Sequence, residues 1–342
     1  EAGIGPMAIA AREDGTTLIS GGLGRNFLYE VSIEGGDVGN GIAELPHPIF
    51  DLEFDANGGL WATTGGGPLL LLNAEPGAIE REFGEAITQT LAIDPASSDV
   101  FVSTNRGVER FDPIAETFTP FSNLRVGNLT FDPEGRLWGA TWPNRETVVR
   151  FAEDGTPEPM LDFDIPIDSL TFGVPGTDLE GLLFISSNAG QLGAGGELIM
   201  IDLATRQQTP VATGGTRGDI VQATADGRLL VSQSNQVDVL QPLVAPKVAF
   251  TNPPADAVVA LPRRTVSITF DQPMFVGMST DPSSILNPNA YTIRGAATGE
   301  VTIDSVVYDE VTQTIDLDVT GLVPDVFTLT IQPTLQNEAG VD

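Results

Sequence analysis

Oxygen-bearing side chains stand at or near the start of several apolar, alternating segments of the chain. They are Asp51, Glu53, Gln89, Asn128, Asp168 and Asp219. Carboxylate and amide oxygens are the ligands that Ca²⁺ and Mg²⁺ prefer in proteins. If the segments surround a common axis, Asp51, Asn128, Asp168 and Asp219 could hold a divalent ion there. The competing interpretation is that these groups hydrogen-bond to one another or to water.

The single histidine of the chain, His47, lies between Pro46 and Pro48, just before one of these segments. Imidazole titrates near neutral pH, so His47 could serve as a general base at the site. A loop histidine packed between prolines is the competing interpretation. No second histidine is present to support hydrolase or lyase chemistry that needs a pair.

Three further residues could bind a ligand outside the axis. Asp162 and Asp164 are two positions apart, which places both on one side of a strand, where they could chelate calcium or form a solvated sheet edge. Trp142 has no counterpart elsewhere in the chain and could offer its ring as a platform for a sugar. Trp61 and Trp138, by contrast, occupy matching places in two copies of a repeat, which predicts that they belong to the core.

The elements that must position these residues belong to that repeat. Each copy has an apolar alternating run, a turn containing Asp or Gly, and a second run that ends in small polar residues, as in 49–64, 89–104 and 128–141, with looser copies at 7–22, 169–187 and 219–234. The turns recur about every 37 to 46 residues, which is the period of a four-stranded propeller blade. The pattern predicts six blades over 1–245, with the first run of each blade lining the axis. The sixth copy lacks a clear fourth strand, so we expect the residues before Met7 or a segment outside this sequence to close the ring.

The stretch Leu-x-Phe-Asp-Pro-x-Gly-x-Leu-Trp-x-Ala-Thr at 129–141, with its copy at 52–64, resembles six-bladed propellers of the NHL, streptogramin-lyase and gluconolactonase-like group. The resemblance covers 1–245 and implies an all-β architecture. Propellers of this kind include lactonases, lyases, protein-binding hubs and sensor domains. The gluconolactonase-like members hold a divalent ion in the channel with Glu, Asn and Asp, which the residue types at the strand starts match only loosely.

Residues 246–342 have a different composition, richer in Thr, Val and Ile, and predict a small β-sandwich. Segments 251–257, 266–274, 287–293, 307–317 and 337–340 resemble, in order, the bacterial Ig-like domain of the SbsA S-layer type. That resemblance implies a secreted or surface protein in which the domain is one link, a spacer without catalytic activity. Calcium bound between such links would rigidify an array, although the sequence contains no EF-hand or RTX repeat.

Composition restricts the function classes. The chain carries 47 Asp and Glu against 16 Lys and Arg, a net charge of −31, which opposes binding to nucleic acid and to anionic membrane surfaces. It has no cysteine, hence no disulfide and no thiolate site, and no apolar run long enough to span a membrane. Glu1 in place of Met suggests that a signal peptide has been removed.

These observations predict a non-enzymatic, extracellular or cell-surface binding and assembly module, part of a larger multidomain protein. Its expected partners are other protein domains or cell-surface components, with carbohydrate as a third class. The alternative is a calcium-dependent lactonase- or lyase-like enzyme with its site in the propeller channel. The enzyme interpretation requires a divalent ion, expected to be calcium, and otherwise no cofactor is expected.

Overall fold

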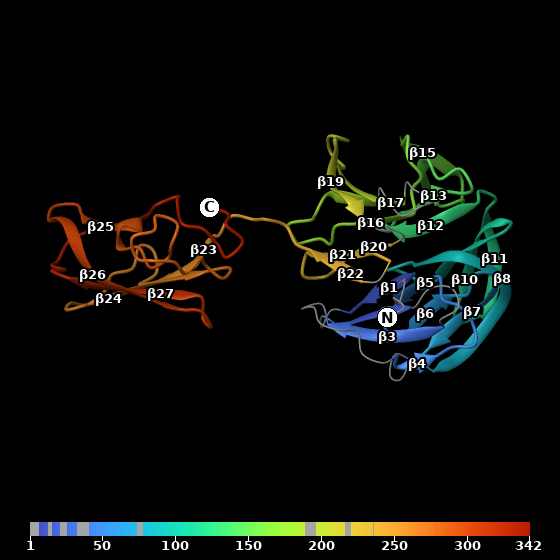
Figure 1. Cartoon of the computed structure of the whole chain (residues 1–342), viewed down its shortest axis with the longest axis horizontal. Coiled ribbons are helices and arrows are strands. Elements are labelled where there is room, and N and C mark those ends of the chain that lie inside the picture. Colours follow the sequence, from blue (N-terminus) through green and yellow to red (C-terminus); the bar gives the residue numbers. More distant parts are fainter. Residues whose placement is uncertain are drawn as a thin grey trace. The chain divides into compact units, whose positions relative to one another are not determined.

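The computed structural model describes residues 7–12, 16–20, 26–32, 41–73, 78–188, 196–215, 220–234 and 236–342. The chain forms two compact units, Glu1–Pro242 and Leu243–Asp342 (Figure 1). Apart from one short 3-10 turn at Pro288–Ala290, the regular elements in the described part are strands. Among these residues no helix has the length and apolarity to cross a membrane. The all-β fold class predicted from the sequence is therefore confirmed.

The first unit is built from antiparallel sheets whose strands follow one another in sequence. The first, third and fourth sheets are four-stranded and form blades one, four and five: β1 (Ala8–Ala11), β2 (Thr16–Ser20), β3 (Phe27–Ser32) and β4 (Ala43–Glu44); β12 (Val126–Phe131), β13 (Leu137–Thr141), β14 (Thr147–Phe151) and β15 (Pro157–Asp162); β16 (Ser169–Phe172), β17 (Leu182–Asn188), β18 (Gly196–Asp202) and β19 (Gln208–Gly215). The fifth sheet, which forms blade six, has three strands in the described residues: β20 (Val221–Ala223), β21 (Leu229–Ser232) and β22 (Val237–Leu240).

The second and third blades share a strand. Their combined sheet has the order β11-β10-β9-β8-β7-β6-β5. Its members are β5 (Asp51–Phe54), β6 (Leu60–Thr63), β7 (Gly67–Leu72), β8 (Ile79–Ile93), β9 (Val100–Thr104), β10 (Gly107–Asp112) and β11 (Thr117–Ser122). The 15-residue β8 is at once the outer strand of blade two and the inner strand of blade three. The sequence predicts a strand only over 79–83 followed by a separate one from 89, whereas the structure keeps them continuous through Gly84 and Ala86, both at positive φ.

The first strands of the blades form a ring. In the described residues β1, β5, β8, β12, β16 and β20 each contact the next, and β20 also contacts β1. This closed order of six inner strands is that of a β-propeller, as predicted. The residues before Met7, which we expect to complete blade six, lie outside the described residues.

The recurring Asp and Trp of the repeat explain the shape of the first hairpins of blades two and four. Asp132 Oδ1 accepts hydrogen bonds from the N–H groups of Glu134 and Arg136, and so holds the turn between β12 and β13. Gly135 in that turn has φ of +76°, a conformation that favours glycine. The other oxygen of Asp132 accepts the indole N–H of Trp138. Both Trp138 and its counterpart Trp61 are buried, in agreement with their predicted place in the core.

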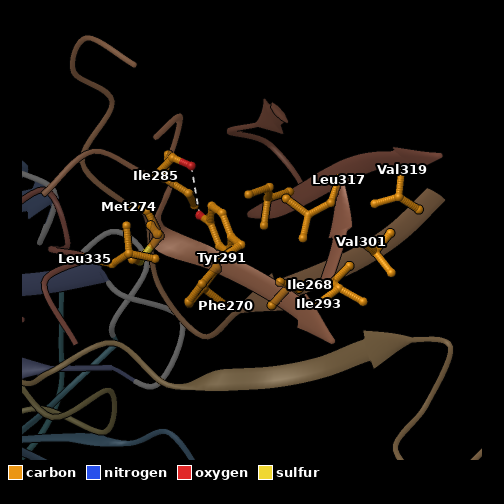
Figure 2. Packing of buried hydrophobic residues seen from close by; sticks show 12 residues of the cluster. Ile268, Phe270, Met274, Ile285, Tyr291, Ile293, Val301, Leu317, Val319 and Leu335 are labelled. Atoms are coloured by element: carbon orange, nitrogen blue, oxygen red, sulfur yellow. Dashed lines mark hydrogen bonds between the residues drawn. The ribbon is translucent and has the colours of Figure 1, made fainter. Parts of the chain in front are cut away.

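The second unit is a six-stranded arrangement around its own apolar core. Its strands are β23 (Val248–Asn252), β24 (Thr265–Phe270), β25 (Tyr291–Gly295), β26 (Gly299–Asp309), β27 (Thr314–Thr320) and β28 (Phe327–Ile331), in the order β23-β24-β27-β26-β25-β28. The long β26 pairs with β25 near its start and with β27 over the rest. Figure 2 shows the buried side chains between these strands, with the hydroxyl of Tyr291 donating to the carbonyl of Ile285 over 2.8 Å. The identity of this unit as an SbsA-type Ig-like domain stays a prediction.

The beginning of the second unit is fastened to its end. The side-chain amide of Asn337, which is 4 % exposed, donates to the carbonyl of Val244 over 3.0 Å and to Oε1 of Gln272 over 2.8 Å. Asn337 Oδ1 in turn accepts the N–H of Val341. The N–H of Lys247 donates to Oδ1 of Asp271, and the carbonyl of Lys247 accepts the N–H of Asp271. Residues 244–247 are therefore part of the folded second unit.

Candidate functional site

Polar side chains on four of the inner strands join blades two to six, each of these blades to the next. The N–H of Leu91 in blade three donates to Oδ2 of Asp51 in blade two over 3.0 Å. The N–H of Leu170 in blade five donates to Oδ1 of Asn128 in blade four over 3.1 Å. Asp51 and Asn128 thus play the same part, as their matching positions in the repeat suggest. We call these side-chain-to-backbone bonds the inter-blade bonds.

Two further residues of this kind were missed by sequence reasoning. The N–H of Leu129 donates to the hydroxyl of Thr90 over 3.0 Å, and the N–H of Val221 donates to that of Ser169 over 3.2 Å. Thr90 and Ser169 each follow directly the residue that was predicted, Gln89 and Asp168. A signal was available, because each acceptor directly precedes a buried leucine at the same place in the repeat, namely Leu52, Leu91, Leu129 or Leu170.

Asp51 and Glu53 form the most strongly perturbed electrostatic pair in the described part of the propeller. Oδ2 of Asp51 also accepts the Thr90 hydroxyl over 2.7 Å, and Oε2 of Glu53 accepts the N–H of Ile93 over 3.2 Å. Burial raises the pKa of Asp51 to about 6 in spite of these hydrogen bonds. Burial, with the charge of Asp51 as the smaller cause, raises the pKa of Glu53 well above its usual range. The two carboxyl groups lie on one side of β5, and that of Asp51 can exchange a proton near neutral pH.

The inter-blade bonds place the starts of the inner strands at one end of the ring. We call this end the mouth. It also carries the loops that join the second and third strands, because antiparallel pairing brings the end of a second strand beside the start of the first. Gln89 and Trp142 meet there around Gly127, where an added Cβ would lie 3.3 Å from Oε1 of Gln89 and 3.2 Å from Cε3 of Trp142. Trp142 is partly buried.

Asp168 lies at the mouth between blades four and five. Its carboxylate forms an ion pair with Arg145, which comes from the loop joining β13 and β14. The guanidinium of Arg145 also lies 5.7 Å from the centroid of the Trp142 ring. Asp168 stands opposite Ser187 at the end of β17, since Ser169 pairs with Ser186 in the register of the two strands. We call Trp142, Arg145, Asp168 and Ser187 the rim cluster.

The other predicted residues lie outside the rim cluster. His47 borders the loop at Gly65–Gly67, its Nδ1 being 3.7 Å from where a Cβ would stand on Gly67. Asp162 and Asp164 are exposed, and Asp162 accepts the Thr147 hydroxyl over 2.8 Å.

Asp219 lies outside the described residues. Within the described ranges, no three histidine and carboxylate side chains come together in the way that a metal site needs. The calcium site stays a prediction.

Comparisons with known proteins give a fold and no family. No family model and no curated protein sequence matches the chain. Among solved structures, it is similar to a protein of unknown function from Bacteroides thetaiotaomicron (TM-score 0.56, 13 % identity, 70 % of each chain covered). It is also similar to a gluconolactonase from Xanthomonas campestris (0.56, 16 %, covering 70 % of this chain and 86 % of the other) and to a streptogramin B lyase (0.51, 13 %, 70 % and 94 %). At these identities the likeness concerns the propeller fold alone.

Proposed function

We propose that the chain is a non-catalytic binding and assembly module of an extracellular or cell-surface protein. The propeller presents its mouth to a ligand or partner, and the second unit acts as an Ig-like spacer of the SbsA type. The second unit's sequence resemblance and the acidic composition support the location outside the cell.

One observation carries this proposal: the inter-blade bonds engage Asp51 and Asn128. A side chain that accepts a backbone N–H from the neighbouring blade stabilises the ring, and its oxygen is then directed at that N–H instead of at a substrate. The same position is filled by Thr90 and Ser169, which are poor ligands for a divalent ion but adequate acceptors. A rigid ring of this kind suits the display of a binding surface.

The test is a comparison of the intact chain with Asp51→Asn and Asn128→Ala. We expect no turnover of lactones or of streptogramin B by any of the three in the presence of 1 mM Ca²⁺ or Mg²⁺. This concentration is about the upper end of the Kd range of extracellular calcium-binding modules. Turnover by the intact chain that Asp51→Asn abolishes would overturn the proposal. Binding of purified cell-surface polymers, retained when the variants keep their fold, would support it.

The alternative is a metal-dependent lactonase- or lyase-like enzyme. The pKa of Asp51, raised by burial to about 6, favours it, because a carboxyl group that titrates near neutral pH can act as a general acid or base. Elemental analysis of the chain after dialysis against metal-free buffer tests this candidate. About one calcium or magnesium per chain would support it, whereas no retained metal would restrict it to weak sites.

A further inference from the structure

The last strand of the second unit leaves an edge of its sheet open. In the described residues β28 pairs only with β25 and stands at the end of the strand order. The N–H of Gln332, next to β28, donates to the carbonyl of Ala290. Since bonded and non-bonded pairs alternate along an antiparallel ladder, Thr330 and Thr328 also direct their backbone bonds toward β25. The residues whose N–H and C=O groups face the open edge are therefore Phe327, Leu329 and Ile331.

β28 lacks the features that protect the outer strands of the blades in the described part of the chain. β11, β15 and β19 each contain proline and have a break in register with their neighbour, and β23, at the other end of the sheet of β28, has such a break as well. β22 carries Asp238, and β4 has only two residues. β28 reads Phe-Thr-Leu-Thr-Ile, with no charge, no proline and an unbroken register with β25. Such an edge is a template for pairing with another strand.

We propose that β28 pairs in antiparallel orientation with β28 of a second copy of the chain, around a two-fold axis at Leu329. A two-fold interface must be complementary to itself. In this register Leu329 lies opposite Leu329 of the second copy, and Phe327 lies opposite its Ile331. The backbone groups that face the open edge then bond to one another in each of these pairs. The side chains of the three residues, which are partly buried against the core of the unit, would continue its apolar layer into the second copy.

The exposed face of β28 fits the same pairing. Thr328 and Thr330 are exposed, and Thr328 would lie directly opposite Thr330 of the second copy. Threonine pairs of this kind stabilise a sheet. Arg294 is the neighbour of Thr328 on β25, and Thr292 is the neighbour of Thr330. The row that starts at Arg294 would therefore end at Thr292 of the second copy, so that the two arginines do not meet.

The net charge of the chain gives the pairing a dependence on salt. Two copies that each carry a charge of −31 repel each other. This repulsion acts over a distance that falls from about 10 Å at 0.1 M salt to about 3 Å at 1 M. β28 adds no charge to it. We therefore expect the dimer to become stronger as the salt concentration rises, whereas an interface made of ion pairs would become weaker.

The first measurement is sedimentation equilibrium of the intact chain. The concentrations run from about 1 µM to 1 mM, which covers the Kd of small interfaces, and the salt from about 0.1 to 1 M. We expect a reversible equilibrium between monomer and dimer, with a lower Kd at high salt. A chain that stays monomeric throughout would overturn the second copy as the partner of β28. A dimer that salt weakens would overturn it too.

Two double variants at the same two positions test which residues face each other. T328E/T330E places glutamate opposite glutamate across the axis and should raise the Kd about tenfold. T328E/T330K places glutamate opposite lysine and should leave the Kd unchanged or lower it. The matched control is T302E/T320E, which adds the same charge at two exposed threonines of β26 and β27 and should stay within twofold of the unaltered chain. Equal effects of the two variants at positions 328 and 330 would overturn the register.

Hydrogen exchange locates the interface without any substitution. The amides of Phe327, Leu329 and Ile331 face the open edge, so they should exchange rapidly in the dilute chain and more slowly as the concentration rises. Slowing that occurs in other segments and spares β28 would overturn the proposal. Thermal midpoints from circular dichroism show whether each variant keeps its fold. The inference does not depend on the proposed function of the mouth, which the turnover assays test separately.

Discussion

The indole N–H of Trp138 donates a hydrogen bond of 2.7 Å to Oδ2 of Asp132, and both side chains are buried. The other oxygen of the same carboxylate holds the turn between β12 and β13. Asp132 thus ties the turn of the hairpin to its second strand. Asp55 and Trp61 repeat the arrangement in blade two, with an indole bond of 2.9 Å.

Replacing Trp138 by Phe should lower the free energy of unfolding by about 1–2 kcal/mol, because Asp132 loses a buried donor while the aromatic packing is largely kept. Urea denaturation followed by far-ultraviolet circular dichroism measures the change. Trp142→Phe is the control, since the partly buried Trp142 makes no such bond in the described residues, and its effect should stay below about 0.5 kcal/mol. Equal losses in both variants would contradict the assigned role of the indole N–H.

Asp51 should make the stability of the propeller depend on pH. Its pKa is about 6 in the folded chain against an ordinary value of 3.8. Between these values the folded state holds a proton that the unfolded state has lost, so the free energy of unfolding falls as the pH rises. Between about pH 4 and 7, the free energy of unfolding should therefore decrease by on the order of 1–2 kcal/mol more in the unaltered chain than in Asp51→Asn, allowing for solvent screening.

Denaturation of the chain and of Asp51→Asn at several pH values in this range tests the prediction. The stability of the variant relative to the unaltered chain should increase with pH, and Glu53→Gln should behave in the same direction. A difference that is constant from pH 4 to 7 would show that Asp51 titrates normally.

Asn128→Ala should destabilise the propeller by about 1–3 kcal/mol, because the N–H of Leu170 loses its acceptor in a buried position. Asn123, an exposed residue of the preceding loop, supplies the matched control as Asn123→Ala. Differential scanning calorimetry should show a lower transition for the first variant and an unchanged one for the second. If the two transitions coincide, the inter-blade bond contributes nothing measurable.

Asn337→Ala should destabilise the second unit by about 2 kcal/mol, because Val244, Gln272 and Val341 each lose a hydrogen-bond partner. The three tryptophans of the chain, Trp61, Trp138 and Trp142, all belong to the first unit. The variant should therefore shift the loss of circular dichroism while leaving the tryptophan fluorescence transition in place. Asn289→Ala, an exposed change in the same unit, is the control. A shift in fluorescence alone would contradict the assignment.

Much of the propeller could be predicted from the sequence, because each blade repeats the same local physics. The Asp, Gly and Trp of the hairpins appear at a fixed spacing, and their burial and hydrogen bonds follow from that spacing. Whether the residues after 245 form an Ig-like domain, and whether calcium binds, stay predictions.

The rim cluster could not be predicted in the same way. Trp142 and Asp168 were singled out, but Arg145 joins them only through the packing of a blade-four loop against blade five. Ser187 looks in the sequence like the paired hydroxyls of other blades. That its buried hydroxyl has no hydrogen-bond partner among the described residues depends on the tertiary structure. Asp51 and Asn128 were recognised as equivalent, yet their acceptor role depends on backbone N–H groups that no residue type reveals.

The continuous β8 has a consequence for how the propeller opens. Fluctuations that detach a single blade break only side-chain contacts and inter-blade bonds elsewhere in the ring, but between blades two and three they must also disrupt a sheet that is continuous across both blades through β8. These two blades therefore constitute one cooperative unit of local unfolding, and their central amides should resist hydrogen exchange together.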